Sequence, residues 1–101
     1  MRICDVVEEL SVDNVMPTDD QLGQLTDCFD DSQWAKSTEI FLRGIGSHHE
    51  VPGKITNTFA GIGDFYRENQ MLTRSQKIWL LAHQIRYWKN LGIEMRATLM
   101  L

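Results

Sequence analysis

The sequence predicts a mainly α-helical protein, a compact bundle of about four to five helices with a candidate short strand at its C-terminus. Apolar residues recur at helical spacing, and two Thr-x-x-Gln capping boxes precede apolar runs. The 101 residues are 43% hydrophobic and 24% charged, as in one ordinary globular domain spanning residues 1–101. This composition argues against intrinsic disorder and against a disulfide-dependent miniprotein.

Three short helices are expected in the first half of the chain. The first, residues 3–10, is predicted by apolar residues at i, i+3, i+4 and i+7, namely Ile3, Val6, Val7 and Leu10. The second begins at the Thr18 capping box and runs to about residue 28. The third begins near Asp30, whose side chain suits a helix N-terminus, and is expected to end before Gly44.

Two longer helices are expected after a glycine-rich surface loop at residues 44–53. The fourth covers about residues 54–69 and the fifth follows the Thr73 capping box as far as residue 90. The fifth helix is apolar on two strips, so we expect it to organise the core with four buried residues, Ile78, Leu81, Ala82 and Ile85.

The spacing of the apolar residues changes in the last nine residues of the sequence. From Ile93 to Leu101 apolar and polar side chains mostly alternate, which is typical of a strand. Two interpretations remain open: this segment pairs with residues 2–7 taken as a strand, or it extends along a neighbouring surface.

Charge is distributed unevenly along the chain. Residues 1–50 contain three basic and eleven acidic side chains, and residues 51–101 contain seven basic and three acidic ones. The halves therefore have formal charges of −8 and +4. Such asymmetry is typical of a docking surface, but we favour the interpretation that the two halves face each other in the fold and partly neutralise one another.

No catalytic constellation stands out, so we expect a non-enzymatic protein with no cofactor and no metal. The segment 48–50, His-His-Glu, is interpreted as a solvated loop because no further ligand completes a familiar metal pattern. Cys4 and Cys28 match no metal or redox spacing and are expected to be free, buried thiols, with a single bridge as the alternative. The longest apolar run, residues 78–82, is far below the roughly 20 residues of a transmembrane helix.

One segment resembles a known class of proteins. Residues 65–76, Phe-Tyr-Arg-Glu-Asn-Gln-Met-Leu-Thr-Arg-Ser-Gln, followed by Ile-Trp-Leu-Leu at 78–81, resemble the helix, Leu-Thr-x-x-Gln, helix segment of small accessory proteins of tailed bacteriophages and other mobile elements. These 16 residues make up about a sixth of the chain. The resemblance implies an accessory factor that binds a protein or nucleic acid. The first residues resemble neither a secretory signal nor an Arg-rich transit peptide, so we expect a cytoplasmic location, which would be the host cytoplasm for a phage-encoded protein.

The leading functional hypothesis is an adaptor or inhibitor that binds an unidentified protein. Its predicted partner surface is acidic and consists of Asp19, Asp20, Asp27, Asp30 and Asp31. Helix capping explains the same residues without any partner. Asp27 and Asp31 are expected to be the better probes, with only a modest effect on stability when both are replaced by Lys.

The alternative hypothesis is a DNA- or RNA-binding module in the basic, aromatic second half. Cationic and aromatic side chains neutralise phosphates and stack on bases, and residues 70–72 could join the fourth and fifth helices as a helix-turn-helix. The candidate residues are Arg74, Gln76, Lys77, Trp79, Arg86 and Lys89.

Overall fold

The computed structural model describes residues 2–12, 16–46 and 50–99, and the regular secondary structure of this described part consists of helices, with no strand. This confirms the mainly α class, with more helices than expected. The elements in chain order are α1 (Ile3–Val12), α2 (Asp19–Thr26), α3 (Asp31–Ile45), α4 (Gly53–Asn69), α5 (Arg74–Tyr87), the 3-10 helix η1 (Trp88–Asn90) and α6 (Ile93–Leu99).

Side-chain caps define the starts of α2, α3 and α5. Thr18 and Thr73 form the two predicted capping boxes. Each threonine hydroxyl accepts a hydrogen bond from the backbone N–H of Gln21 or Gln76, and the side chain of that glutamine accepts one from the backbone N–H of the threonine. Asp30 forms a third capping box with Gln33. These reciprocal bonds satisfy backbone N–H groups that have no partner inside the helix.

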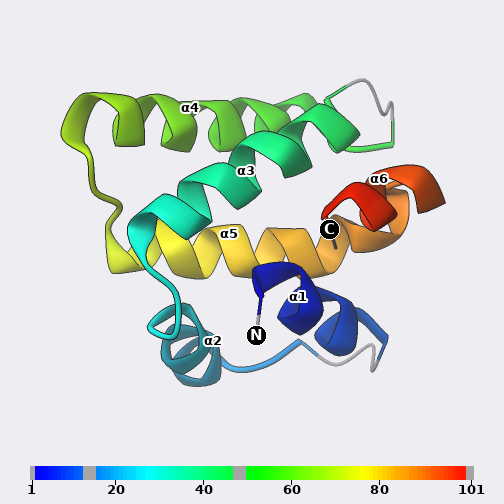
Figure 1. Ribbon diagram of the computed structural model, residues 1–101, viewed down its shortest axis with the longest axis horizontal. Helices are drawn as coiled ribbons and strands as arrows, with labels where there is room; N and C mark the ends of the chain where they lie inside the picture. Colours follow the sequence, from blue (N-terminus) through cyan, green and yellow to red (C-terminus); the bar gives the residue numbers. More distant parts are fainter. Residues whose placement is uncertain (1, 13–15, 47–49, 100–101) are drawn as a thin grey trace.

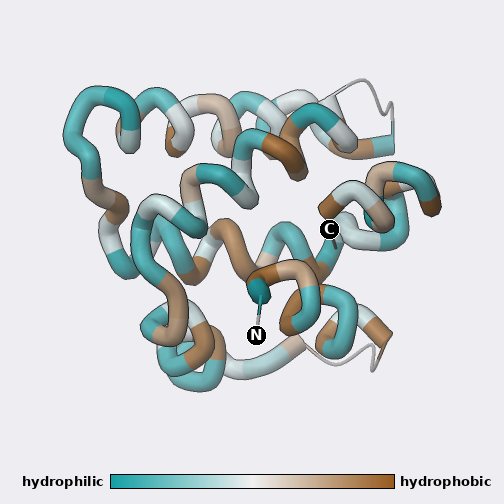
Figure 2. Tube along the Cα trace, in the orientation of Figure 1, coloured by the Kyte–Doolittle hydropathy of each residue, from teal (hydrophilic) through white to brown (hydrophobic). Residues whose placement is uncertain are grey.

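Helix α5 lies at the centre of the fold, in contact with α1, α2 and α3. Figure 1 shows α3 and α4 on one side of α5 and the pair α1 and α2 on the other, while Figure 2 shows how apolar residues recur along the helices. Leu81 and Ile85 are buried as predicted, whereas Ile78 and Ala82 are half-buried. Leu80, on the second apolar strip, is fully buried.

The predicted strand at residues 93–101 is wrong for its described part, because Ile93–Leu99 is the helix α6. Residues 2–7 provide no partner strand since they lie largely in α1. Met95 and Leu99, four residues apart, instead turn one helical face onto the core, while Ile93 stays 78% exposed.

The expected end of the third helix before Gly44 is also wrong, because α3 continues to Ile45. A Cβ atom at Gly44 would lie 2.4 Å from Leu91 Cδ2 and 2.9 Å from Met95 Cγ. Glycine therefore lets Leu91 and α6 pack closely against the end of α3. None of the helices described here is both long enough and apolar enough to cross a membrane.

Candidate interaction surfaces

The five aspartates of the predicted partner surface surround the starts of α2 and α3 and the end of α2. Asp19 and Asp20 occupy the exposed first turn of α2, where their charges complement the helix dipole. Asp30 caps α3 and accepts hydrogen bonds from the Ser32 hydroxyl at 2.6 Å and the Gln33 N–H at 2.8 Å. These bonds lower the pKa of Asp30.

Asp31 joins α3 to the start of α5. Its carboxylate accepts from the backbone N–H of Leu72 and from Lys77 Nζ, each at 3.0 Å. The hydrogen bond from Leu72, and then the one from Lys77, lower the pKa of Asp31. The side chains of Asp31 and Lys77 are only 30% and 16% exposed, so this link is part of the structural framework.

Asp27 forms a looser contact with α5. Its carboxylate lies 3.7 Å from Arg74 Nη2, and both side chains are more than half exposed. The Arg74 guanidinium lies across Gly23 of α2, where an added Cβ would come within 2.3 Å of Nη2. The missing side chain at Gly23 lets Arg74 cross α2 toward Asp27.

These two ion pairs bear out the interpretation that the two halves of the chain partly neutralise one another. Each joins a predicted acidic partner residue, Asp27 or Asp31, to a predicted nucleic-acid-binding residue, Arg74 or Lys77. They also overturn the choice of Asp27 and Asp31 as a pair of mild probes. Because Asp31 joins two helices, its replacement by Lys would disturb the fold along with any partner surface.

The other residues of the predicted nucleic-acid site are spread along α5 and η1. Gln76 belongs to the α5 capping box. Trp79 is half-buried and packs edge-on against Phe59 of α4, with ring centroids 5.0 Å apart. Arg86 and Lys89 are exposed at the opposite end from Arg74 and Lys77. The basic side chains therefore form two separate groups.

His83 lies in an aromatic row on α5. Its ring stacks on Trp79 at 3.9 Å and faces Tyr87 at 6.3 Å, and its Nδ1 lies 2.8 Å from the Trp79 carbonyl oxygen. Burial, the largest cause, lowers the pKa of His83 and so favours the neutral ring.

The described residues contain no group of three potential metal ligands. His48 and His49 of the predicted solvated loop lie outside the described residues, and Glu50 is exposed. Both cysteines are free thiols as expected, but only Cys4 is buried; the expectation of burial is wrong for Cys28, which is exposed. Burial raises the pKa of the Cys4 thiol, which keeps it protonated and unreactive.

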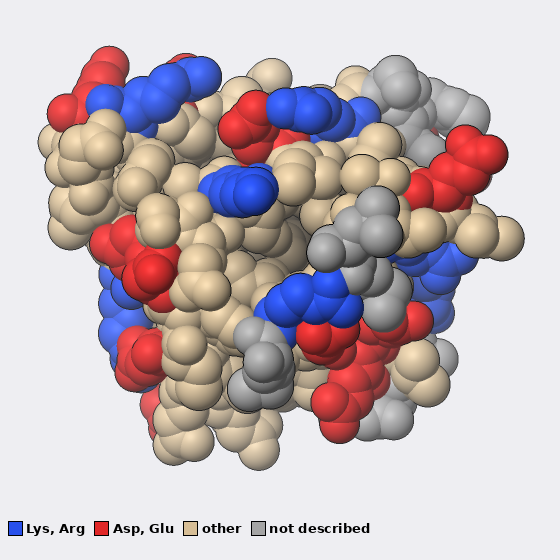
Figure 3. Space-filling view, in the orientation of Figure 1, with Lys and Arg blue, Asp and Glu red and all other residues tan. Residues whose placement is uncertain are grey.

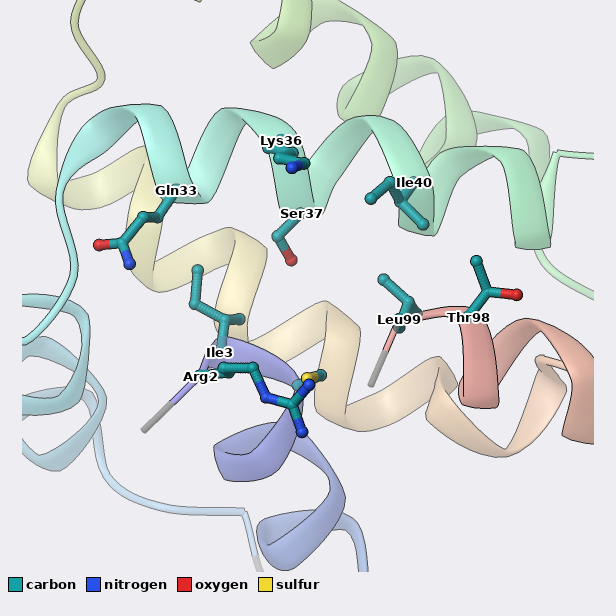
Figure 4. Close-up of a pocket in the computed structure, with 9 residues that line it drawn as sticks. Arg2, Ile3, Gln33, Lys36, Ser37, Ile40, Thr98 and Leu99 are labelled. Carbon is teal, nitrogen blue, oxygen red and sulfur yellow. The ribbon is translucent and has the colours of Figure 1, made fainter. Parts of the chain in front are cut away.

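A cavity that sequence analysis missed lies between α1, α3 and α6, with a volume of about 400 Å³ (Figure 4). Figure 3 shows this face of the molecule hollowed near its centre. Ile3, Ile40 and Leu99 supply apolar walls, and Lys36 and Ser37 add a cation and a hydroxyl. Because the cavity depends on how three separate helices meet, no local sequence signal could have located it.

No protein-family model matches the chain, and no curated protein or solved structure is detectably similar to it.

Proposed function

We propose that this chain is a non-enzymatic accessory protein, an adaptor or inhibitor that binds a basic surface of another protein. The observation that supports this proposal is the charge of the α1–α2 side. Residues 1–30 contain eight carboxylate side chains and a single cationic side chain, Arg2. Because α1 and α2 both lie on the same side of α5 (Figure 1), their charges add to a negative field that would steer a basic partner.

Asp19 and Asp20 are the best placed carboxylates for a partner. Both are exposed, and within the described part of the chain neither takes part in an ion pair. Asp27 adds to the same surface, because its contact with Arg74 is exposed and long enough for a partner's cation to compete. Carboxylates also gather over α1 in Figure 3. The resemblance to phage accessory proteins and a cytoplasmic location belong to the same proposal.

The nucleic-acid alternative has weaker support. Arg74 and Lys77 each have an intramolecular carboxylate within 4 Å, and releasing them to phosphates would expose Asp27 and Asp31 to the same polyanion. Arg86 and Lys89 alone provide few phosphate contacts. We therefore expect no salt-sensitive binding of labelled DNA or RNA at micromolar protein concentrations, and such binding would reverse this ranking.

The proposal is tested by capturing partners from the native host with the immobilised protein and measuring the association rate of each identified partner. The informative variant is Asp19→Lys with Asp20→Lys, and its matched control is Asp64→Lys with Glu68→Lys on exposed positions of α4. Both double variants change the net charge by the same amount. We expect the α2 variant to slow association at low salt at least tenfold more than the control. Equal effects would show that only net charge matters and would refute this surface.

A further inference from the structure

Short side chains at the junction of three helices open the cavity between α1, α3 and α6. Cys4, Ser37 and Thr98 line it from the three different helices, and none of them is large enough to fill the junction. In Figure 4, Ser37 points from α3 into the gap, where Ile40 and Leu99 also lie. A volume of about 400 Å³ is within the range of small-molecule sites, about 300–1,000 Å³.

A buried polar pair fixes one wall of the cavity. The Ser37 hydroxyl lies 3.2 Å from Gln84 Oε1 and 3.1 Å from Gln84 Nε2, and Gln84 of α5 is 98% buried. A buried amide requires such a partner, so the contact holds the position of Ser37 beside the cavity. The polar wall is therefore preformed.

The charges around the cavity are cationic. Lys36 and Arg2 line it, and no Asp or Glu among the described residues does. Arg2 already pairs with Asp5 of α1, whereas Lys36 takes part in no ion pair within the described chain. A ligand bound here would meet apolar walls, a hydroxyl and one available ammonium group.

The neighbouring cavity between α3 and α4, of about 480 Å³, differs in this respect. Its lining includes the carboxylate of Glu39 together with Lys36 and Arg67. The lining of that cavity therefore places a carboxylate beside its two cations, whereas the described lining of the α1–α3–α6 cavity contains cations without a carboxylate.

We propose that the α1–α3–α6 cavity binds an organic monoanion with an apolar tail, of the size of a medium-chain fatty acid. The carboxylate lies at Lys36 near the Ser37 hydroxyl, and the tail lies between Ile40 and Leu99. An anion paired with an ammonium group and an apolar chain removed from water both favour this class of ligand. This site is separate from the acidic surface proposed for the protein partner, so either proposal can fail alone.

The test uses decanoate as the probe and decanol as a neutral comparison of equal chain length, both followed by isothermal titration calorimetry. We expect the protein to bind decanoate about three to five times more tightly than decanol, the range of a partly exposed ion pair. Lys36→Gln removes this preference. Lys54→Gln, which deletes an exposed cation on α4 outside the cavity lining, preserves it.

A second variant blocks the cavity itself. Thr98 is exposed on α6 and lines the cavity, so Thr98→Trp fills the space with little effect on the core and is expected to weaken both probes at least tenfold. Amide NMR shifts on adding decanoate should centre on Ser37 and Leu99. The proposal is overturned by undetectable decanoate binding at millimolar concentration, by shifts centred elsewhere, or by unchanged affinity in Thr98→Trp.

Discussion

The link from Asp31 to Leu72 and Lys77 is expected to stabilise the protein measurably. Asp31→Ala removes two charge-assisted hydrogen bonds, each 3.0 Å long, and leaves the backbone N–H of the buried residue Leu72 without its carboxylate. Hydrogen bonds to charged groups contribute about 1.5–3 kcal/mol to stability, so we expect Asp31→Ala to lower the free energy of unfolding by about that amount. The Lys77 contact accounts for about 0.5–1 kcal/mol of this, because the Asp31 side chain is 30% exposed and solvent screens it.

Asp31→Asn separates the two contributions. The asparagine keeps an oxygen that accepts from Leu72 but loses the charge that attracts Lys77, so it should cost about 0.5–1 kcal/mol. Urea unfolding at pH 7, followed by circular dichroism, measures both losses. The control is Asp64→Asn, an exposed carboxylate paired with Arg67 within α4, which should change the unfolding free energy by less than about 0.5 kcal/mol.

The pH dependence provides a second check on the same link. The pKa of Asp31 is lowered in the folded protein from 3.8 by the hydrogen bonds from Leu72 and Lys77. The stabilisation by its charge is therefore fully present above pH 3.8 and is lost as the pH falls through the folded pKa. This account would be refuted if, at pH 7, Asp31→Ala lowered the free energy of unfolding no more than Asp64→Asn does. It would also be refuted if the difference in unfolding free energy between wild type and Asp31→Asn became larger as the pH falls.

Three further predictions concern the core, a helix end and a histidine. Leu81→Ala should lower the unfolding free energy by about 2–5 kcal/mol in urea titrations, because Leu81 is fully buried on the central helix. Gln70→Gly should raise the melting temperature, since Gln70 ends α4 at φ 56°, a left-handed conformation that costs a non-glycine residue about 1 kcal/mol. Burial lowers the pKa of His83 from 6.5, so the unfolded chain binds its proton more readily and stability declines as the pH falls below about 6.5. His83→Phe keeps an aromatic ring beside Trp79 and should reduce this decline between pH 7.5 and 5.5.

Local sequence signals located the helices because capping is a local interaction. The Thr18 and Thr73 hydroxyls bond to backbone groups only three residues away, so the pattern and the structure it specifies lie in the same short segment. The apolar face of α1 was also visible in its spacing. The alternation after Gly92 was misleading because contacts with distant residues outweigh the local pattern. Met95 and Leu99 pack against the core, and Met95 lies beside Gly44 near the end of α3.

The contacts that organise the candidate surfaces are long-range and were outside the reach of local patterns. Asp31 meets Leu72 and Lys77 across more than forty residues, and Ser37 meets Gln84 across 47. The charge asymmetry of the two halves was the available signal for the first contact. It predicted that the halves attract each other, but it did not identify the residues that meet.

The same ion pairs constrain what the two ends of the molecule can do. Arg74 and Lys77 hold Asp27 and Asp31 near the start of α5, which leaves Asp19 and Asp20 as the exposed carboxylates of the first turn of α2. Lys36 lies on α3 and faces the α1–α3–α6 cavity. A basic partner and an organic anion would therefore meet different helices, α2 and α3. If both proposals hold, decanoate should leave the partner's association rate unchanged, since neither ligand occupies the other's contacts. Competition between them would show that the two sites are coupled.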